Sequence, residues 1–178
     1  VPAGGRVAVF GLGWLGHLAV QFAAAMCYET IALARGTERT AQASQLGADR
    51  YIDTNDESPA AVLAGLSGAD LIVYTASDTG PATQLLGGLA VHGRLVLVGV
   101  DAGRMTVPVA DLVMHARLVT GHLTGSPRDT EDAMRFAVRN GVRPVIEHLP
   151  LREAATAIDR LRHGAVRFRT VLDPWERP

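Results

Sequence analysis

Three glycines near the start of the chain have a spacing that suits the binding of a pyrophosphate. Gly11, Gly13 and Gly16 form a G-x-G-x-x-G pattern. The apolar run from Val7 to Phe10 precedes this pattern, and a predicted helix over residues 17–26 follows it. In such an arrangement the first glycine makes the turn, the second lets a pyrophosphate reach the backbone, and the third lets the helix pack close to the strand. The pattern predicts a dinucleotide-binding turn, and the alternative is a glycine-rich loop with a purely steric role.

The end of the second predicted strand, residues 30–34, carries the residues that select the dinucleotide. An acidic side chain there normally accepts hydrogen bonds from the ribose hydroxyls of NAD. In this chain the position is Ala34, and Arg35, Thr37 and Arg39 follow it. The missing carboxylate removes repulsion against a 2′-phosphate, and a guanidinium can bind phosphate through two parallel hydrogen bonds. The sequence therefore favours NADP over NAD; the alternative is that both arginines are solvated loop charges.

Side chains that could hold a metal ion are few and scattered. Cys27 is the only cysteine, and the six histidines, at positions 17, 92, 115, 122, 148 and 163, have no metal-ligand spacing. Zinc catalysis needs three protein ligands around an open position. The histidines are interpreted as surface or core residues, so we assign no metal ligand and no catalytic residue. A single cysteine also excludes an internal disulfide and gives no indication of an oxidising compartment.

Strands and helices alternate along most of the chain, and they must position these residues. Strands are predicted at 7–10, 30–34, 50–53, 70–75, 94–100 and 118–122, and helices at 17–26, 37–46, 59–66, 81–90 and 111–115. Buried strands that alternate with helices require a parallel sheet covered on both faces. The predicted fold is α/β, a doubly wound, mostly parallel six-stranded Rossmann sheet with helices on both faces. Its ligand is expected at the carboxyl ends of the strands.

The last third of the chain has no second glycine fingerprint. It is predicted to contain helices at 130–140 and 152–163 and strands at 144–147 and 167–172. We therefore divide the chain into an NAD(P)-binding domain, residues 1–123, and a C-terminal segment, residues 124–178.

Bulk composition indicates one globular domain and excludes two classes of partner. The 178 residues are 48% hydrophobic and 20% charged, with a net charge of −1. This balance provides no basic field for nucleic acid and no polybasic patch for a membrane. No apolar run reaches transmembrane length and no signal peptide is visible, so a cytoplasmic protein is expected. Because the chain starts at Val1 without a methionine, we expect a fragment or an excised domain.

Four segments carry a resemblance to a known family. Residues 4–23, 46–49, 92–99 and 164–172 resemble, in the family's order, the cofactor-binding half of zinc-type medium-chain alcohol dehydrogenases. The Gly-Leu-Gly-x-Leu-Gly-His pattern is closer to the alcohol and cinnamyl-alcohol dehydrogenase branches than to the zinc-free quinone reductases. The resemblance implies hydride transfer between NAD(P) and an alcohol or aldehyde, dependent on zinc in the full-length parent.

The same resemblance implies what this chain lacks. The family's catalytic zinc is held by cysteine, histidine and acidic residues of an N-terminal domain, which also holds a four-cysteine structural zinc. With one cysteine neither site can be built here, so the isolated chain is expected to bind the cofactor without zinc and without turnover. Two alternatives remain open: a fragment of a zinc-free reductase and a stand-alone NAD(P)-sensing module.

The resemblance also assigns cofactor contacts by position. Residues 75–77 would lie beside the adenosine, residues 98–100 beside the nicotinamide, and residues 122–124 beside its carboxamide. Arg169 matches an arginine that reaches the pyrophosphate, whereas Trp14 replaces a residue that is usually small. The full set of expected cofactor-binding residues is Gly11, Leu12, Gly13, Trp14, Leu15, Gly16, Ala34, Arg35, Thr37, Arg39, Thr75, Ala76, Val98, Gly99, Val100, His122, Leu123 and Arg169.

A predicted edge strand at Met105–Val109 suggests how the chain assembles. An exposed apolar edge is a liability unless another surface covers it. In the family that the chain resembles, this region pairs with its copy across a two-fold axis, which is also the commonest closed contact. We expect a homodimer through residues 104–120; the alternative is that Arg104 and Pro108 protect the edge of a monomer.

Overall fold

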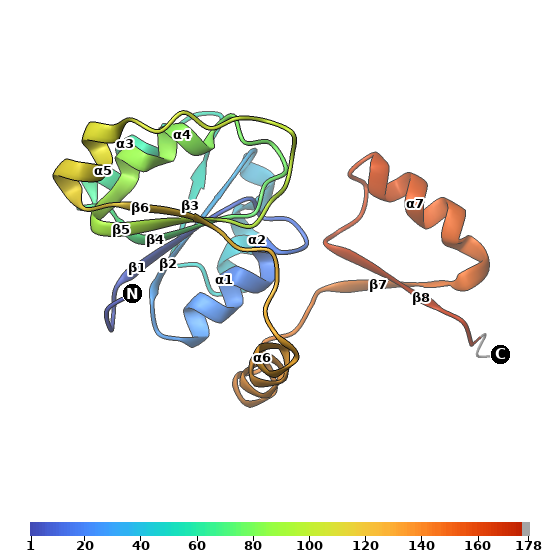
Figure 1. Ribbon diagram of the computed structural model, residues 1–178. Coiled ribbons are helices and arrows are strands. Elements are labelled where there is room, and N and C mark those ends of the chain that lie inside the picture. The colour runs from blue at the N-terminus through green and yellow to red at the C-terminus, as the bar shows by residue number, and fades with distance from the viewer. Residues whose placement is uncertain (176–178) are drawn as a thin grey trace.

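The computed structural model describes residues 1–175, and a parallel sheet forms its centre (Figure 1). Among these residues, six strands pair in the order β3-β2-β1-β4-β5-β6, and every neighbouring pair is parallel. Their bounds are β1 (Arg6–Phe10), β2 (Glu29–Ala34), β3 (Arg50–Asp53), β4 (Ala69–Tyr74), β5 (Leu89–Leu97) and β6 (Leu118–Gly121). The order reverses between β1 and β4, because the chain runs outward to β3 and then returns to the other side of β1. The predicted doubly wound sheet is confirmed.

Helices cover both faces of this sheet, as predicted (Figure 1). Their bounds are α1 (Gly16–Ala25), α2 (Thr40–Gln45), α3 (Pro59–Gly65), α4 (Ala82–Leu85) and α5 (Val109–His115), with short 3₁₀ turns η1 (Thr37–Arg39) and η2 (Leu86–Gly88). Each face has its own apolar core. Leu63 and Leu85 bring α3 and α4 into one core, and Val20 and Ala43 bring α1 and α2 into the other.

Strand β1 shows why the sequence forms this architecture. Successive side chains of a strand point to opposite faces of the sheet. Ala8 and Phe10 accordingly belong to one core, whereas Val7 and Val9 belong to the other. A strand that is apolar at every one of these positions can only be stable at the centre of a sheet that is covered on both sides.

The predicted edge strand at Met105–Val109 is wrong. Within the described residues no strand forms there, β6 is the edge strand on this side of the sheet, and α5 begins at Val109. Met105 and Val107 are half-buried and pack against the core on the α3 and α4 face. Burial of these two side chains holds the segment across that face, so its backbone does not extend the sheet.

The helix predicted over residues 81–90 is shorter, and the following strand begins earlier. Gly87 and Gly88 have low helix propensity, so α4 ends at Leu85 and a single 3₁₀ turn follows. A Cβ on Gly88 would lie 3.1 Å from the Ala60 Cα of α3, so this turn is packed closely on the neighbouring helix. β5 ends at Leu97, which leaves residues 98–100 in the loop beyond the sheet.

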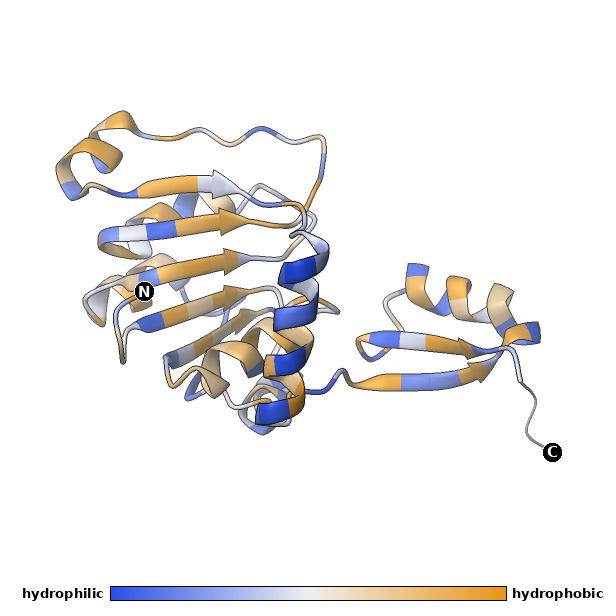
Figure 2. Cartoon of the chain, turned by 60° about the horizontal axis from the view of Figure 1, so that its bottom comes forward, coloured by the Kyte–Doolittle hydropathy of each residue, from blue (hydrophilic) through white to orange (hydrophobic). Residues whose placement is uncertain are grey.

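The C-terminal part adds one long helix and a second, smaller sheet. α6 (Pro127–Asn140) is followed by β7 (Ile146–Pro150), a 3₁₀ turn η3 (Leu151–Glu153), α7 (Ala154–Arg162) and β8 (Arg169–Asp173). β7 and β8 pair in parallel as their own two-stranded sheet, which projects away from the Rossmann sheet (Figure 1). α6 is largely hydrophilic, in contrast to the apolar central strands (Figure 2). The domain division at residue 123 stays a prediction.

Candidate dinucleotide-binding site

A cleft of about 700 Å³ opens at the carboxyl ends of the central strands. Loops that follow β1, β2, β3 and β4 line it, so it lies where the strand order reverses. This is the place at which doubly wound sheets bind their ligands, and its volume is in the range of small-molecule sites. The cleft brings together the following predicted residues: Gly11, Leu12, Gly13, Trp14, Leu15, Ala34, Arg35, Arg39, Thr75 and Ala76.

The three glycines of the predicted turn differ in what surrounds them. Gly11 has φ +94°, in the left-handed region that favours glycine. A Cβ on Gly16 would lie only 1.7 Å from the Gly11 carbonyl oxygen, so α1 can pack this close only without a side chain. Around Gly13, in contrast, a Cβ would meet no atom within 4 Å. The second glycine therefore leaves space on the open side of the turn, where a phosphate would lie.

Thr75 fastens the glycine turn to the neighbouring strand. Its hydroxyl lies 3.0 Å from the Phe10 carbonyl oxygen and 2.8 Å from that of Gly11. A Cβ on Gly99 would lie 1.8 Å from the Ala76 carbonyl oxygen, so the loops after β4 and β5 also touch. These contacts make one continuous rim from the loops of β1, β4 and β5.

The loop after β2 is held by residues of β3. The Tyr51 hydroxyl donates to the carbonyl oxygens of Ala34 and Gly36, at 3.0 Å and 2.6 Å. The Gly36 N–H donates to Asp53 at 2.9 Å. Burial, followed by the charge of Asp53, raises the pKa of Tyr51, so its hydroxyl stays a donor. Backbone positions next to Arg35 are therefore fixed before any ligand binds.

The two arginines of this loop have different surroundings. Arg35 is exposed at the cleft. Arg39 donates from Nη1 to the Leu12 carbonyl oxygen at 3.0 Å, which joins η1 to the glycine turn. Its Nε lies 3.9 Å from the Glu38 carboxylate, a distance at which an exposed pair contributes little. Arg35 is thus the cation that is free to turn toward a ligand.

Asp101 holds the loop beyond β5. It accepts hydrogen bonds from the Thr79 and Gly103 N–H groups at 2.8 Å and 2.9 Å. These two bonds lower the pKa of the Asp101 carboxyl, which is exposed to solvent.

Tyr74, at the end of β4, holds the loop that follows it. Its hydroxyl donates to the Asp78 carbonyl oxygen, and burial raises the pKa of Tyr74 to about 12.

His17 connects the glycine turn to the C-terminal part. Its side chain is fully buried, with Nδ1 3.1 Å from the Gly13 carbonyl oxygen and Nε2 3.2 Å from the Val145 N–H nitrogen. These partners require Nδ1 to carry the proton and Nε2 to accept, so the ring is neutral. Its ring also stacks on Phe168 at 4.3 Å. Burial lowers the pKa of His17 and the charge of nearby Arg169 also lowers it, against the hydrogen bond to Gly13, which raises it.

Comparison with known proteins identifies the family. The family model described as "Zinc-binding dehydrogenase" matches residues 15–139. The chain belongs to the zinc-binding dehydrogenase family. This confirms the resemblance to zinc-type medium-chain alcohol dehydrogenases, a family that uses a nicotinamide cofactor.

Relatives within this family include dehydrogenases for several alcohols. The chain is 42% identical to "Alcohol dehydrogenase notN" of Aspergillus sp. (strain MF297-2), over 97% of this chain and 50% of that protein. It is 34% identical to "Probable cinnamyl alcohol dehydrogenase 9" of Oryza sativa subsp. japonica, over 96% of this chain and 47% of that protein. The solved structure of a Sorghum bicolor cinnamyl alcohol dehydrogenase superposes with a TM-score of 0.86 at 31% identity, over 96% of this chain and 48% of that chain. The chain therefore spans about half the length of the relatives it matches.

The part of the chain that the structure describes contains no candidate zinc site. Within residues 1–175, no group of three or more His, Cys, Asp or Glu side chains is placed to hold a metal ion. The side chains of these residues thus do not fit a catalytic zinc, which needs three protein ligands. In the same residues, none of the helices combines the length and apolar composition that a bilayer crossing requires.

Some predicted residues do not line the cleft. They are Gly16, Thr37, Val98, Gly99, Val100, His122, Leu123 and Arg169. Val100 and Leu123 are 74% and 86% exposed, so the expected nicotinamide contacts stay predictions. Gly16 lies at the start of α1 and packs against the Gly11 carbonyl oxygen behind the turn. Arg169 lies against the Trp14 ring.

Sequence reasoning also missed residues that line the cleft. They follow β3, belong to α3 or α4, or end β4, and include Thr54, Asn55, Ser58, Pro59, Tyr74 and Gln84. The short polar stretch after residue 53 could have indicated the residues that follow β3, because β3 ends at the same edge of the sheet as β2.

Proposed function

We propose that this chain is the cofactor-binding part of an NAD(P)-dependent alcohol dehydrogenase. The observation that carries this proposal is the glycine turn. Gly16 is forced to be glycine by the close approach of α1, while Gly13 faces open space at the cleft. A bound nicotinamide dinucleotide would supply the ring carbon that exchanges a hydride with an alcohol or aldehyde. The residues of this chain bind and orient that cofactor.

The glycine turn suits the pyrophosphate because of its backbone. The helix dipole places partial positive charge at the N-terminus of α1, where the N–H groups of His17 and Leu18 donate to the Gly13 and Leu15 carbonyl oxygens at 3.0 Å and 3.1 Å. Leu15, at the N-cap, has no side-chain hydrogen bond to these groups. Phosphate oxygens would therefore accept from the N–H groups of the turn ahead of these, at residues 14–16, with Gly13 allowing close approach.

We further propose that the cofactor is NADP. Ala34 is 6% exposed and offers no carboxylate to the adenine ribose, and exposed Arg35 follows it at the cleft. A 2′-phosphate there meets a guanidinium and no fixed negative charge from position 34. Tyr51 and Asp53 hold the backbone on either side, so little reordering of the loop is needed.

Titration of the chain with NADPH and NADH tests this preference. NADPH should bind about ten- to a hundredfold more tightly, as expected for a charge-assisted bidentate contact. Arg35→Ala should remove most of that difference. Arg50→Ala is the matched control, because Arg50 is an exposed arginine at the start of β3, at the opposite end of the strand from the cleft. Equal affinity of the unaltered chain for both cofactors would exclude NADP selectivity.

Activity of the whole protein is a separate proposal. The parent oxidises an alcohol or reduces an aldehyde, with zinc ligands supplied from outside the described residues, and the 178-residue chain alone binds cofactor without turnover. Metal analysis and an alcohol oxidation assay with added zinc test this. Measurable turnover by the chain would contradict the proposal that the catalytic residues lie outside it. The cytoplasmic location stays a prediction.

We also propose that the chain forms a homodimer through residues 104–120. The support is an exposed apolar surface on α5 and β6, where Val109, Val113, Met114 and Leu118 are 71%, 72%, 78% and 46% exposed. Surfaces of this kind mark contacts between proteins. Because β6 is one of the two edge strands of the described sheet, a two-fold contact here would cover both the strand and the helix.

A further inference from the structure

A corner of the C-terminal part packs directly on the glycine turn. Phe168, just before β8, has φ +66°, a backbone conformation that bulky residues rarely adopt. It is nevertheless 8% exposed, and its ring stacks on His17 of α1. Residues held in such a conformation persist only where the surroundings fix them, and they gather at ligand sites. The corner is therefore fixed against the first turn of α1.

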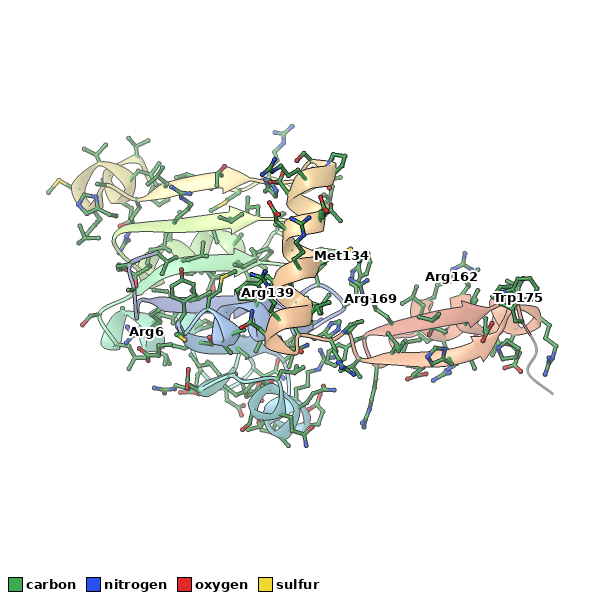
Figure 3. The ribbon with its side chains drawn as sticks, turned by 90° about the horizontal axis from the view of Figure 1, so that it is seen from below. Arg6, Met134, Arg139, Arg162, Arg169 and Trp175 are labelled. Carbon is green, nitrogen blue, oxygen red and sulfur yellow. The ribbon has the colours of Figure 1, made fainter. Side chains whose placement is uncertain are left out.

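The next residue in this corner, Arg169, reaches the glycine turn itself. Its guanidinium carbon lies 4.9 Å from the centre of the Trp14 ring, within cation–π range. Nε and Nη2 of Arg169 each lie 3.4 Å from the Trp14 carbonyl oxygen. Figure 3 labels Arg169 at the junction between the Rossmann sheet and the β7–β8 unit. One residue of the turn thus holds the guanidinium through both its ring and its backbone.

The charge of Arg169 is not neutralised by this arrangement. Within residues 1–175, no carboxylate lies within ion-pair distance of its guanidinium. Trp14 is 59% exposed and lines the cleft, so its side chain does not belong to the hydrophobic core. An unpaired guanidinium beside a helix N-terminus is suited to an anion, because both carry positive charge toward it.

We propose that Trp14 is a positioning residue, whose ring holds the Arg169 guanidinium beside the phosphate-binding turn before a dinucleotide arrives. This inference rests on the proposed function. A free arginine side chain loses rotamer freedom when it binds a ligand, and a side chain that is already held loses less. Trp14 therefore strengthens binding through Arg169 without itself contacting the phosphates.

A double-mutant cycle with NADPH as the probe tests this role. By calorimetry, Trp14→Ala should weaken binding about three- to tenfold, the range of a partly exposed cation–π contact. Trp14→Phe keeps an aromatic face and should restore most of the affinity. In the Arg169→Ala chain, Trp14→Ala should have no further effect. Trp175→Phe is the matched control, because Trp175 is 78% exposed at the far end of the β7–β8 unit (Figure 3).

Two results would overturn the proposal. If the Trp14→Ala variant binds NADPH as tightly as the unaltered chain, the ring does not position Arg169. An equal loss in the presence and absence of Arg169 would show that Trp14 contacts the ligand itself. Both results leave binding by the unaltered chain intact, whereas failure of the proposed function abolishes it.

The ligand-free contact can be tested independently of binding. The chain has two tryptophans, so the Trp175→Phe chain reports on Trp14 alone. In that background Arg169→Ala should change the tryptophan emission, because the cation leaves the ring. An unchanged emission spectrum would exclude the contact on which the proposal depends.

Discussion

Gly13→Ala separates the space needed by the protein from the space needed by its ligand. A Cβ at Gly13 would meet no atom within 4 Å, and Gly13 is absent from the glycines with positive φ. The substitution should therefore fold without strain and raise stability by about 0.4–1 kcal/mol, through lower entropy of the unfolded chain. The same methyl group would occupy the side of the turn that a pyrophosphate approaches. We expect NADPH affinity to fall about tenfold or more, equivalent to ~1.4 kcal/mol or more.

Calorimetric titration with NADPH and urea unfolding, applied to the same preparation, check the two halves of this prediction. Gly65→Ala is the matched control, because a Cβ there also meets nothing within 4 Å but lies in α3, outside the cleft lining. It should not change affinity. Unchanged NADPH binding by Gly13→Ala would refute the reasoning, and so would a loss of binding that comes with a loss of stability.

Further predictions concern the turn, the histidine and the interface. Gly16→Ala should lower the free energy of unfolding by about 1–3 kcal/mol, the usual cost of overpacking, because its Cβ would lie 1.7 Å from the Gly11 carbonyl oxygen; urea unfolding measures this. Because the pKa of His17 is lowered in the folded chain, its contribution to stability is present above the ordinary value of 6.5 and is lost as the pH falls below it. The free energy of unfolding should therefore decrease as the pH falls below 6.5, and this pH dependence should disappear in His17→Gln. Val113→Lys should convert the proposed dimer to a monomer in light scattering at micromolar concentration, and a monomeric unaltered chain would contradict the dimer.

The sheet could be predicted from sequence because its signals are local. Apolar β-branched runs such as Val7–Phe10 and the glycine pattern after them have few alternative structures. Helix ends with specific caps are local in the same way: Ser58 accepts from the Ala61 N–H, and Gly141 ends α6 with φ +71°. Each of these features depends on neighbours within a few residues.

Features that depend on distant residues could not be predicted. The segment at 105–109 alternates like a strand, but the burial of Met105 and Val107 against a core from other elements decides its path. Likewise, nothing near Trp14 in sequence indicates Arg169, which is 155 residues away. The role of Tyr51 in holding the loop after β2 follows only from the pairing of β2 with β3.

Hydrogen exchange of the 178-residue chain with and without NADPH tests the central claim most directly, because it maps the bound cofactor on the backbone. The account predicts that NADPH protects the glycine turn at 11–16 and the loop after β2 at 35–39, both of which border the cleft. Residues 154–162 of α7, which are absent from the cleft lining, should exchange as before. Protection that is absent from the glycine turn, or that appears only outside the cleft, would contradict the assignment of this cleft as the dinucleotide site.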